Sequence, residues 1–255
     1  MTNILAIVRK EWNGYFASPI GYVVIGMYAI VFGYFYTVGL SWFIRQSMQA
    51  PQMGGGGAMN INQQMIRYVF LNSTVIFLFV VPLITMRTYA EEKRSGTIEL
   101  LMTSPITDFQ IVMGKFLGAM SLYVAMLGIT LVHMAVLFVY GNPEWKPILS
   151  GYLGLLLLGG CFVSVGLFFS SLTKNQIVAG MFTFAVLLLL WVIDWVGGFT
   201  GPTVERITSY LSLTGHMEDF LRGIVDSQHI VYYLSFITFG LFLTAKAVDS
   251  ERWRG

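Results

Sequence analysis

The chain has 255 residues, of which 56% are hydrophobic and only 11% are charged. Soluble domains carry about 25% charged residues, so this composition excludes an ordinary soluble protein and indicates a membrane protein. The formal net charge of +2 is too small to indicate nucleic-acid binding. The single cysteine, Cys161, excludes a disulfide within the chain.

Six segments are apolar enough to form membrane-spanning helices. Such a helix needs about 20 mostly apolar residues, because lipid offers no partners for backbone polar groups. We therefore expect an all-α integral membrane protein with one domain over residues 1–255. Lys115 and Lys246 fall near the ends of two spans, and their long side chains are expected to reach the headgroups. The predicted spans cover residues 20–44, 68–86, 112–140, 148–172, 177–199 and 230–248.

The distribution of lysine and arginine predicts the orientation of these spans. If the N-terminus lies inside, one side of the membrane holds ten of the 15 basic residues. Cytoplasmic loops carry the excess of positive charge, so both termini are predicted to be cytoplasmic. Residues 87–110 then lie inside, and residues 45–66 and 200–229 lie outside.

Three segments outside the spans have distinct characters. Residues 2–17 carry apolar side chains at helical spacing, which predicts an amphipathic helix in the inner headgroup layer. Residues 45–66 contain four consecutive glycines and are expected to form a flexible external loop. Residues 200–229 mix apolar and charged side chains, which predicts short helices that dip into the outer leaflet, with one helical stripe over 217–225. The stripe expected on residues 2–17 is Leu5, Val8, Trp12, Tyr15 and Phe16.

A compact charged cluster follows the second predicted span. Five ionised groups at bilayer depth would cost about 12 to 18 kcal/mol on insertion scales, so residues 87–94 must leave the membrane. The simplest interpretation is a solvated loop. We then expect these charges to lie in water, so that charge reversal at Glu92 or Arg94 leaves folding intact. The cluster consists of Arg87, Glu91, Glu92, Lys93 and Arg94.

The residues after this cluster favour a folded element over a loop. Gly96 interrupts the chain, and Thr97 is expected to cap a short helix with Glu99 in its first turn. Thr107 and Gln110 have the spacing of a capping box, which predicts a sharp start for the third span. A rigid charged helix between two spans suits the transfer of force from a soluble partner. In the third span, Gly114-x-x-x-Gly118 would allow a second helix to approach closely.

Catalytic chemistry is not indicated. The sequence has no phosphate-binding loop, zinc-binding H-E-x-x-H or nucleophile-elbow motif, and no paired carboxylates or nucleophile–base set stands out. His133, His216 and His229 are far apart in the sequence, and His133 is expected to pack without binding a metal. Asp194 is the only acidic residue inside a predicted span. It is a candidate polar group in a substrate path, although its place near the outer membrane surface favours an interfacial residue.

Residues 82–107, "PLITMRTYAEEKRSGTIELLMTSPIT", resemble the corresponding segment of ABC-2 type transporter permeases. Residues 211–253 and the stretch "VRKEWNGYFASPIGYVV" resemble the branch that includes gliding-motility-associated permeases and the permease of nitrous-oxide-reductase maturation. The resemblance implies type V exporter-like architecture: a six-span half-transporter in the bacterial inner membrane, with a second permease and two cytoplasmic ATPase subunits. The second permease is either identical or different.

The resemblance also implies roles for particular segments. The helix at 2–17 matches the family's connecting helix, residues 88–104 its coupling region, and residues 200–229 its external re-entrant hairpin. ATP and Mg²⁺ would bind the partner ATPase, so this chain is expected to hold no cofactor and to be no enzyme. The runner-up function is an energy-transducing subunit of an envelope machine, such as a gliding or secretion apparatus, without conventional cargo. The positions that match the coupling helix are Arg87, Glu91, Glu92, Arg94, Gly96, Thr97 and Glu99.

Overall fold

The computed structural model describes residues 2–49, 60–197 and 202–252. Throughout these residues the regular elements are helical, and six of the helices are long and apolar enough to cross a membrane. The prediction of an all-α protein with six spans is therefore confirmed. The long helices are α2 (Pro19–Gln49), α3 (Arg67–Thr85), α6 (Asp108–Tyr140), α7 (Trp145–Leu172), α8 (Gln176–Gly197) and α11 (Ser227–Arg252).

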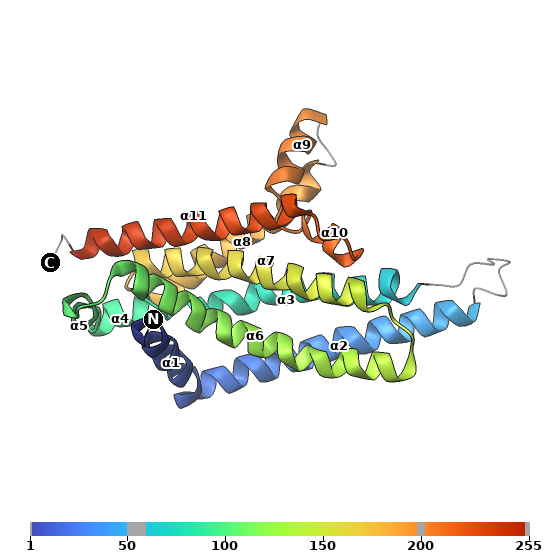
Figure 1. The fold of residues 1–255 in the computed structure, drawn as a ribbon, viewed down its shortest axis with the longest axis horizontal. Coiled ribbons are helices and arrows are strands. Elements are labelled where there is room, and N and C mark those ends of the chain that lie inside the picture. The colour runs from blue at the N-terminus through green and yellow to red at the C-terminus, as the bar shows by residue number, and fades with distance from the viewer. Residues whose placement is uncertain (1, 50–59, 198–201, 253–255) are drawn as a thin grey trace.

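The six long helices run side by side along the long axis of the molecule (Figure 1). At one end, α1 (Thr2–Ala17) packs against α6, and the short helices α4 (Ala90–Ser95) and α5 (Ile98–Thr103) lie close to the end of α11. We call this the terminal end. A short π-helix, η2 (Asn62–Ile66), leads into α3. Two further helices, α9 (Pro202–Leu211) and α10 (Met217–Leu221), join α8 to α11, and α9 projects sideways from the bundle.

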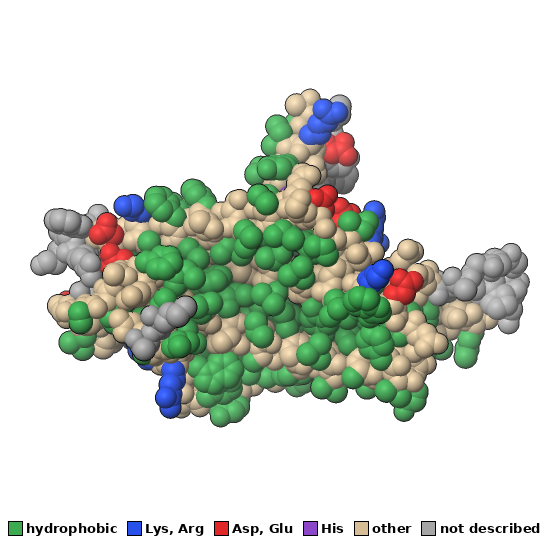
Figure 2. All heavy atoms as spheres, in the orientation of Figure 1, with side chains coloured by type: hydrophobic (Ala, Val, Ile, Leu, Met, Phe, Trp, Pro, Cys, Tyr) green, Lys and Arg blue, Asp and Glu red, His purple; other side chains and the backbone are tan. Residues whose placement is uncertain are grey.

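The spans divide into an enclosed pair and an outer set. The most apolar windows of α7 and of the span that contains α3 are 72% and 67% buried, whereas those of α2, α8 and α11 are 28%, 22% and 17% buried. The outer helices therefore present apolar side chains to their surroundings, as a lipid-facing surface requires. Figure 2 shows apolar side chains over the middle of one face, with charged side chains mainly toward its ends and on α9.

Glycines allow α6 to approach its neighbours α7 and α1 closely. The ring of Tyr123 on α6 lies against Gly159 of α7, and the Tyr123 hydroxyl donates a hydrogen bond to the Leu155 carbonyl oxygen at 2.7 Å. On another face of α6, a Cβ added at Gly114 or at Gly118 would lie 2.7 Å from a side-chain carbon of α1. The close approach predicted for Gly114-x-x-x-Gly118 therefore occurs, and the approaching helix is α1.

The packing of α1 differs from the predicted stripe. Leu5 is 66% exposed, whereas Ile7 is buried against Gly114 and Glu11 lies against Gly118. Two small residues on α6 admit the face of α1 that carries Ile7 and Glu11, and Leu5 of the predicted stripe faces away from α6. The placement of this stripe in the inner headgroup layer stays a prediction. Val8, Trp12, Tyr15 and Phe16 are partly buried.

The predicted external segments are more helical or shorter than expected. Helix α2 continues to Gln49, and η2 begins at Asn62, so both edges of the expected flexible loop 45–66 are helical; residues 50–59 lie outside the described part. The prediction of a single helical stripe over 217–225 is wrong. Helix α10 ends at Leu221 because Gly223 adopts a left-handed conformation with φ 86°. Ile224 and Val225 then lie beyond the helix and are about half exposed.

We predict that Gly159→Ala lowers the free energy of unfolding by about 1 to 3 kcal/mol, because the new methyl group would overlap the Tyr123 ring. Gly128→Ala on α6 is the matched control, because a Cβ there would meet none of the described atoms of other elements within 4 Å. The control should be neutral or stabilising by about 0.5 to 1 kcal/mol. Thermal unfolding in detergent micelles measures both, and equal effects would contradict the packing argument.

Candidate functional site

A sharp turn at residues 86–89 separates α3 from the charged helix α4, and one hydroxyl group holds it. Ser170 on α7 accepts the backbone N–H groups of Tyr89 and Ala90 at 3.0 and 3.2 Å, and its Oγ lies 3.1 Å from the Met86 carbonyl oxygen, to which it donates. Ser170 therefore satisfies backbone hydrogen-bonding groups at the end of α3 and at the start of α4. Sequence reasoning missed this residue, because a serine in an apolar span carries no signal of such a contact.

The charged cluster is itself a helix with its charges in a favourable order. Glu91 and Glu92 lie in the first turn of α4, and Lys93 and Arg94 lie in its last turn, which complements the helix dipole. Arg87, just before the helix, makes two contacts with Glu91, at 2.8 and 3.1 Å. The helix stops because the next residue, Gly96, adopts φ 74° as its C-cap.

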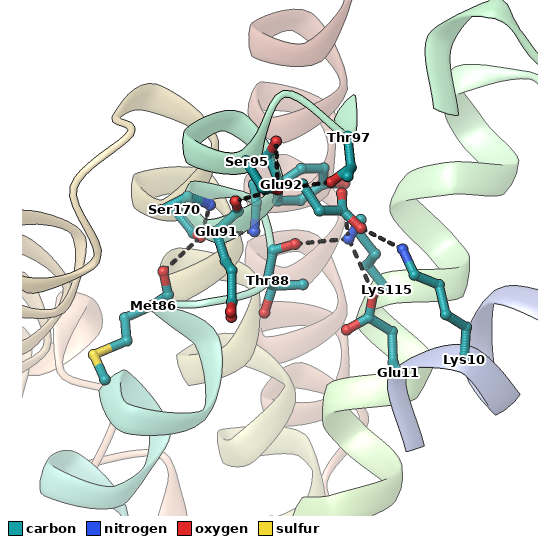
Figure 3. Close-up of polar contacts among 12 residues, drawn as sticks. Lys10, Glu11, Met86, Thr88, Glu91, Glu92, Ser95, Thr97, Lys115 and Ser170 are labelled. Carbon is teal, nitrogen blue, oxygen red and sulfur yellow. Dashed lines mark hydrogen bonds and ion pairs between the residues drawn. The ribbon is translucent and has the colours of Figure 1, made fainter. Parts of the chain in front are cut away.

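Four side chains form an ion network at the terminal end, in which Lys115 is fully buried and Lys10 is 58% exposed. Glu92 contacts Lys10 Nζ through Oε1 at 2.5 Å and Lys115 Nζ through Oε2 at 2.9 Å. Lys115 Nζ also lies 3.0 Å from Glu11 Oε1. These residues come from α1, α4 and α6, and Figure 3 shows Glu11 and Glu92 pointing toward the Lys115 ammonium group, with Lys10 on the other side of Glu92. The network therefore joins three elements that are far apart in the sequence.

The Lys115 ammonium group lies at the centre of this network. Its side chain is 0% exposed, its Nζ donates to the Thr88 carbonyl oxygen at 2.6 Å, and it lies 4.8 Å from the centroid of the Tyr89 ring. The expectation that Lys115 reaches the headgroups is wrong, because two carboxylates and a carbonyl satisfy it inside the protein. Lys246, by contrast, is exposed.

Lys10 completes the charge balance, since two ammonium groups then face two carboxylates. Burial on its own would lower the pKa of Lys10, but the hydrogen bond and charge of Glu92, together with the charge of Glu11, raise it above its ordinary value. Lys10 therefore stays charged at neutral pH, and the network carries no net charge. A balanced network of this kind can be buried, whereas an isolated ion is costly.

The expectation that the whole charged cluster lies in water is wrong for two of its members. The Glu92 side chain is 12% exposed, and that of Lys93 is 3% exposed and pairs with Glu251 near the end of α11 at 2.5 Å. Reversing the charge of Glu92 would leave Lys115 facing a like charge in a buried site, so this change would disrupt folding. Only part of the cluster, including the exposed Arg94, can be changed without such a penalty.

The outward side of α4 and α5 is exposed. We call it the outer face: the exposed residues Arg94, Glu99 and Leu100 on the two helices, with Lys174 and Ile177 beside Arg94. Leu100 is 73% exposed and Ile177 is 69% exposed. Arg94, Lys174 and Ile177 line one shallow hollow between α4 and the start of α8. The outer face therefore combines positive charge with exposed apolar side chains.

The two predicted helix caps have different outcomes. Thr107 caps α6 as predicted: its Oγ1 accepts the Gln110 N–H at 3.3 Å, and Gln110 Oε1 accepts the Thr107 N–H at 3.4 Å. The predicted capping role of Thr97 is wrong. Thr97 adopts helical angles, φ −71° and ψ −12°, and its hydroxyl lies 2.9 Å from Ser95 Oγ. An N-cap requires extended angles for its side chain to reach the next N–H groups.

The remaining sequence candidates lie away from the terminal end. The side chain of Asp194, late in α8, lies outside the described part of the structure, so its role in a substrate path stays a prediction. His133 packs edge-on against Phe32 and Tyr36, in agreement with the predicted packing role. His216 and His229 are far apart in the sequence, but in the structure their rings lie in contact.

Six long apolar helices, with charged groups gathered at the terminal end in a buried network and an exposed face, define a multi-pass helical membrane protein. The chain belongs to the ABC-2 family of transporter proteins, whose family description matches residues 45–222, more than half of the chain. This membership confirms the predicted family and agrees with the prediction of a membrane transport protein and not an enzyme.

Two curated proteins from Escherichia coli are similar to part of the chain. The probable multidrug ABC transporter permease YbhR is 31% identical over 133 residues, which are 51% of this chain and 34% of the relative. The inner membrane transport permease YhhJ is 32% identical over 109 residues, 43% of this chain and 28% of the relative. The matched region thus spans about a third or less of the length of these relatives.

We predict that Lys115→Met lowers the free energy of unfolding by about 3 to 5 kcal/mol, because Glu92 and Glu11 would lose their buried cation. Lys174→Met, at an exposed position, is the matched control and should be nearly neutral. Adding Glu92→Gln to Lys115→Met should recover part of the loss, since one uncompensated carboxylate is removed. Thermal unfolding in micelles tests this, and equal effects of the two lysine changes would argue against the network.

Proposed function

We propose that this chain is the permease subunit of an ATP-binding-cassette transporter, and that α4 and α5 receive force from a separate ATPase. The observation that supports this proposal is the two-sided environment of α4. Its inner side is bound to α6 through Glu92, to α11 through Lys93 and to α7 through Ser170. Its other side forms part of the exposed outer face, where a soluble protein can bind.

The residues of the segment then divide into two roles. Glu92, together with Lys93, holds α4 against the spans, so that movement of α4 moves α6 and α11. Stiff contacts are needed for this, and charge pairs in a low-dielectric interior are stronger than the same pairs in water. Arg87 and Glu91 brace the start of α4, and Gly96 and Thr97 form the turn into α5. Arg94 and Glu99 would contact the ATPase directly.

The proposed assembly follows the family resemblance. Two ATPase subunits would bind ATP and Mg²⁺, and a second permease, identical or different, would complete the pathway; this chain itself would hold no cofactor. The family resemblance supports a bacterial inner-membrane location, and the excess of basic residues on one side supports an orientation with both termini in the cytoplasm. The terminal end would then face the ATPase, and α9 and α10 would form the external hairpin.

Two further features support finer assignments within the family. The resemblance of residues 211–253 supports the branch of gliding-motility and nitrous-oxide-reductase-maturation permeases. The packing of α1 against α6 through Ile7 and Glu11 supports its role as a connecting helix, because movement of α1 would reach the same span as movement of α4. Cargo is left unassigned, since the permease YbhR is named for multidrug transport and matches only half of this chain.

We predict that Arg94→Glu weakens capture of the ATPase and lowers coupled ATP hydrolysis in nanodiscs, while membrane levels stay normal. An interfacial charge left without its partner commonly costs about 2 to 5 kcal/mol, or at least about thirtyfold in affinity. Arg45→Glu, an exposed arginine at the far end of α2, is the matched control and should behave as the unchanged protein. Co-purification and hydrolysis rate are the readouts. If the Arg94→Glu protein captures the ATPase fully and supports an unchanged rate of ATP hydrolysis, the proposed docking role is contradicted.

We also predict opposite labelling of two single cysteines introduced into a Cys161→Ser chain. A membrane-impermeant thiol reagent applied outside should label Ser209→Cys on α9, whereas Lys174→Cys should react only after the cytoplasmic side is opened. Both positions are exposed, so access depends on sidedness and not on burial. Labelling of Lys174→Cys from outside intact cells would show that the proposed orientation is inverted.

A further inference from the structure

Two histidines and an aspartate form a continuous chain of contacts where the α9–α10 segment meets α11. His216, just before α10, places Nε2 3.0 Å from the Tyr210 carbonyl oxygen and Nδ1 2.7 Å from Nδ1 of His229. His229, in the first turn of α11, places its Nε2 2.8 Å from Asp219 Oδ2 on α10. The chain therefore runs from a carbonyl through two imidazole rings to a carboxylate.

The number of protons in this chain follows from the contacts. A carbonyl oxygen only accepts, so His216 Nε2 must carry a hydrogen. Two ring nitrogens 2.7 Å apart need a hydrogen between them, and a carboxylate needs one from His229 Nε2. Three hydrogens are required, whereas two neutral imidazoles supply only two. The three contacts can all form only when the group binds one additional proton.

The surroundings favour His229 as the ring that holds this proton. Burial lowers the pKa of His216, and the nearby His229 ring lowers it further, while the Tyr210 carbonyl and the Asp219 charge act in the opposite direction; the net effect is a lowered pKa. His216 therefore stays neutral, donating through Nε2 and accepting at Nδ1. His229 can then donate to both of its neighbours, and Asp219 balances its charge.

The other charged groups of the packed elements do not replace this proton. Glu218, next to Asp219 on α10, already forms an ion pair with Arg67 at the start of α3, at 2.6 Å. No group of three or more His, Cys, Asp or Glu side chains within the described residues is arranged to hold a metal ion. Further ionisable groups on the neighbouring elements include Lys146, Tyr152, Cys161, Glu205, Arg206, Tyr210, Arg222, Asp226, Tyr232 and Tyr233.

We propose that His216, His229 and Asp219 form a proton-binding site that fastens α10 to the start of α11. When the proton is bound, all three contacts are satisfied; when it leaves, at least one contact must break. The stabilisation is therefore present at low pH and is lost as the pH rises through the range in which histidine titrates, about pH 5 to 8. This proposal rests on the geometry of the segment and does not depend on the proposed ATPase coupling.

Other contacts limit what the proton controls. Tyr232 and Tyr233 of α11 donate to the carbonyl oxygens of Leu211 and Leu213 at 2.9 and 2.6 Å, and these bonds do not require the proton. Helix α10 is also tied to α7, because the Ser150 hydroxyl donates to the Phe220 carbonyl oxygen. Loss of the proton should therefore loosen only the contact between α10 and α11. With the proposed orientation, the site would respond to the pH outside the cell.

The experiment is amide hydrogen exchange of the full chain in lipid nanodiscs between pH 5.5 and 8.5, with rates corrected for the intrinsic effect of pH. We expect residues 214–230 to exchange about tenfold faster at the high end of this range, as the loss of a charge-assisted hydrogen bond implies. Residues 150–165 of α7 should show no such change. Corrected rates for 214–230 that do not vary with pH would overturn the proposal.

Substitution of Asp219 gives a sharper test, because Asn can donate. In Asp219→Asn the amide would donate to His229 Nε2, so two neutral imidazoles would satisfy all three contacts. We expect this variant to keep slow exchange at pH 8.5, whereas His229→Gln should exchange fast at every pH. Asp226→Asn is the matched control, since Asp226 accepts the Gln228 N–H outside this chain of contacts, and it should keep the wild-type pH dependence.

The outcomes of these variants decide the proposal. Slow, pH-independent exchange in Asp219→Asn with unchanged behaviour in Asp226→Asn supports it. Wild-type pH dependence in either Asp219→Asn or His229→Gln would show that another group titrates. If Asp219→Asn does not fold, His216→Gln provides the same test, because it removes one ring and should abolish the pH dependence.

Discussion

The buried ammonium group of Lys115 constrains the whole terminal end of the molecule. A cation that is fully removed from water must be paired, and here the pairing comes from Glu11 on α1 and Glu92 on α4. The connection between α3 and α6 is therefore fixed in position, since it carries one of the required carboxylates. Lys10 then balances the second carboxylate. The position of α1 and that of α4 follow from the same charge.

This constraint explains how a short charged helix can be both fixed and accessible. The inward side chains of α4 are held by ion pairs, and the Ser170 hydroxyl holds the backbone at the start of α4. Arg94 and Leu100, by contrast, are exposed. A solvated loop would absorb a push from a soluble protein. A helix bound to three spans would transmit that force to them, and the proposed coupling role depends on this difference.

The segment that joins α8 to α11 uses a different kind of polar contact. Its attachment to α11 combines tyrosine hydroxyls that bond backbone carbonyls with the pair of imidazole rings at His216 and His229. The first kind is insensitive to physiological pH, and the second requires a proton. One junction is thereby held by a permanent part and a titratable part, whereas the network around Lys115 is built from ammonium–carboxylate ion pairs.

Local sequence determined much of this protein, because its signals act over a few residues. Apolar length predicted the six spans, the Thr107 and Gln110 pair predicted the start of α6, and Gly96 predicted the break before the short helix α5. Each depends on contacts within one turn of helix or on the cost of placing charge in lipid. The resemblance of residues 82–107 predicted the family in the same local way.

Tertiary structure decided which charges are buried and which residues meet. Glu92 and Arg94 belong to the same charged cluster in the sequence, yet only Glu92 faces the buried Lys115 of α6. The contact of His216 with His229 depends on where α10 ends, and Ser170 has its role only because α3 turns beside it. Ion pairs and hydrogen bonds between distant segments need a partner at about 3 Å, and only the packing of the helices determines which side chains come that close.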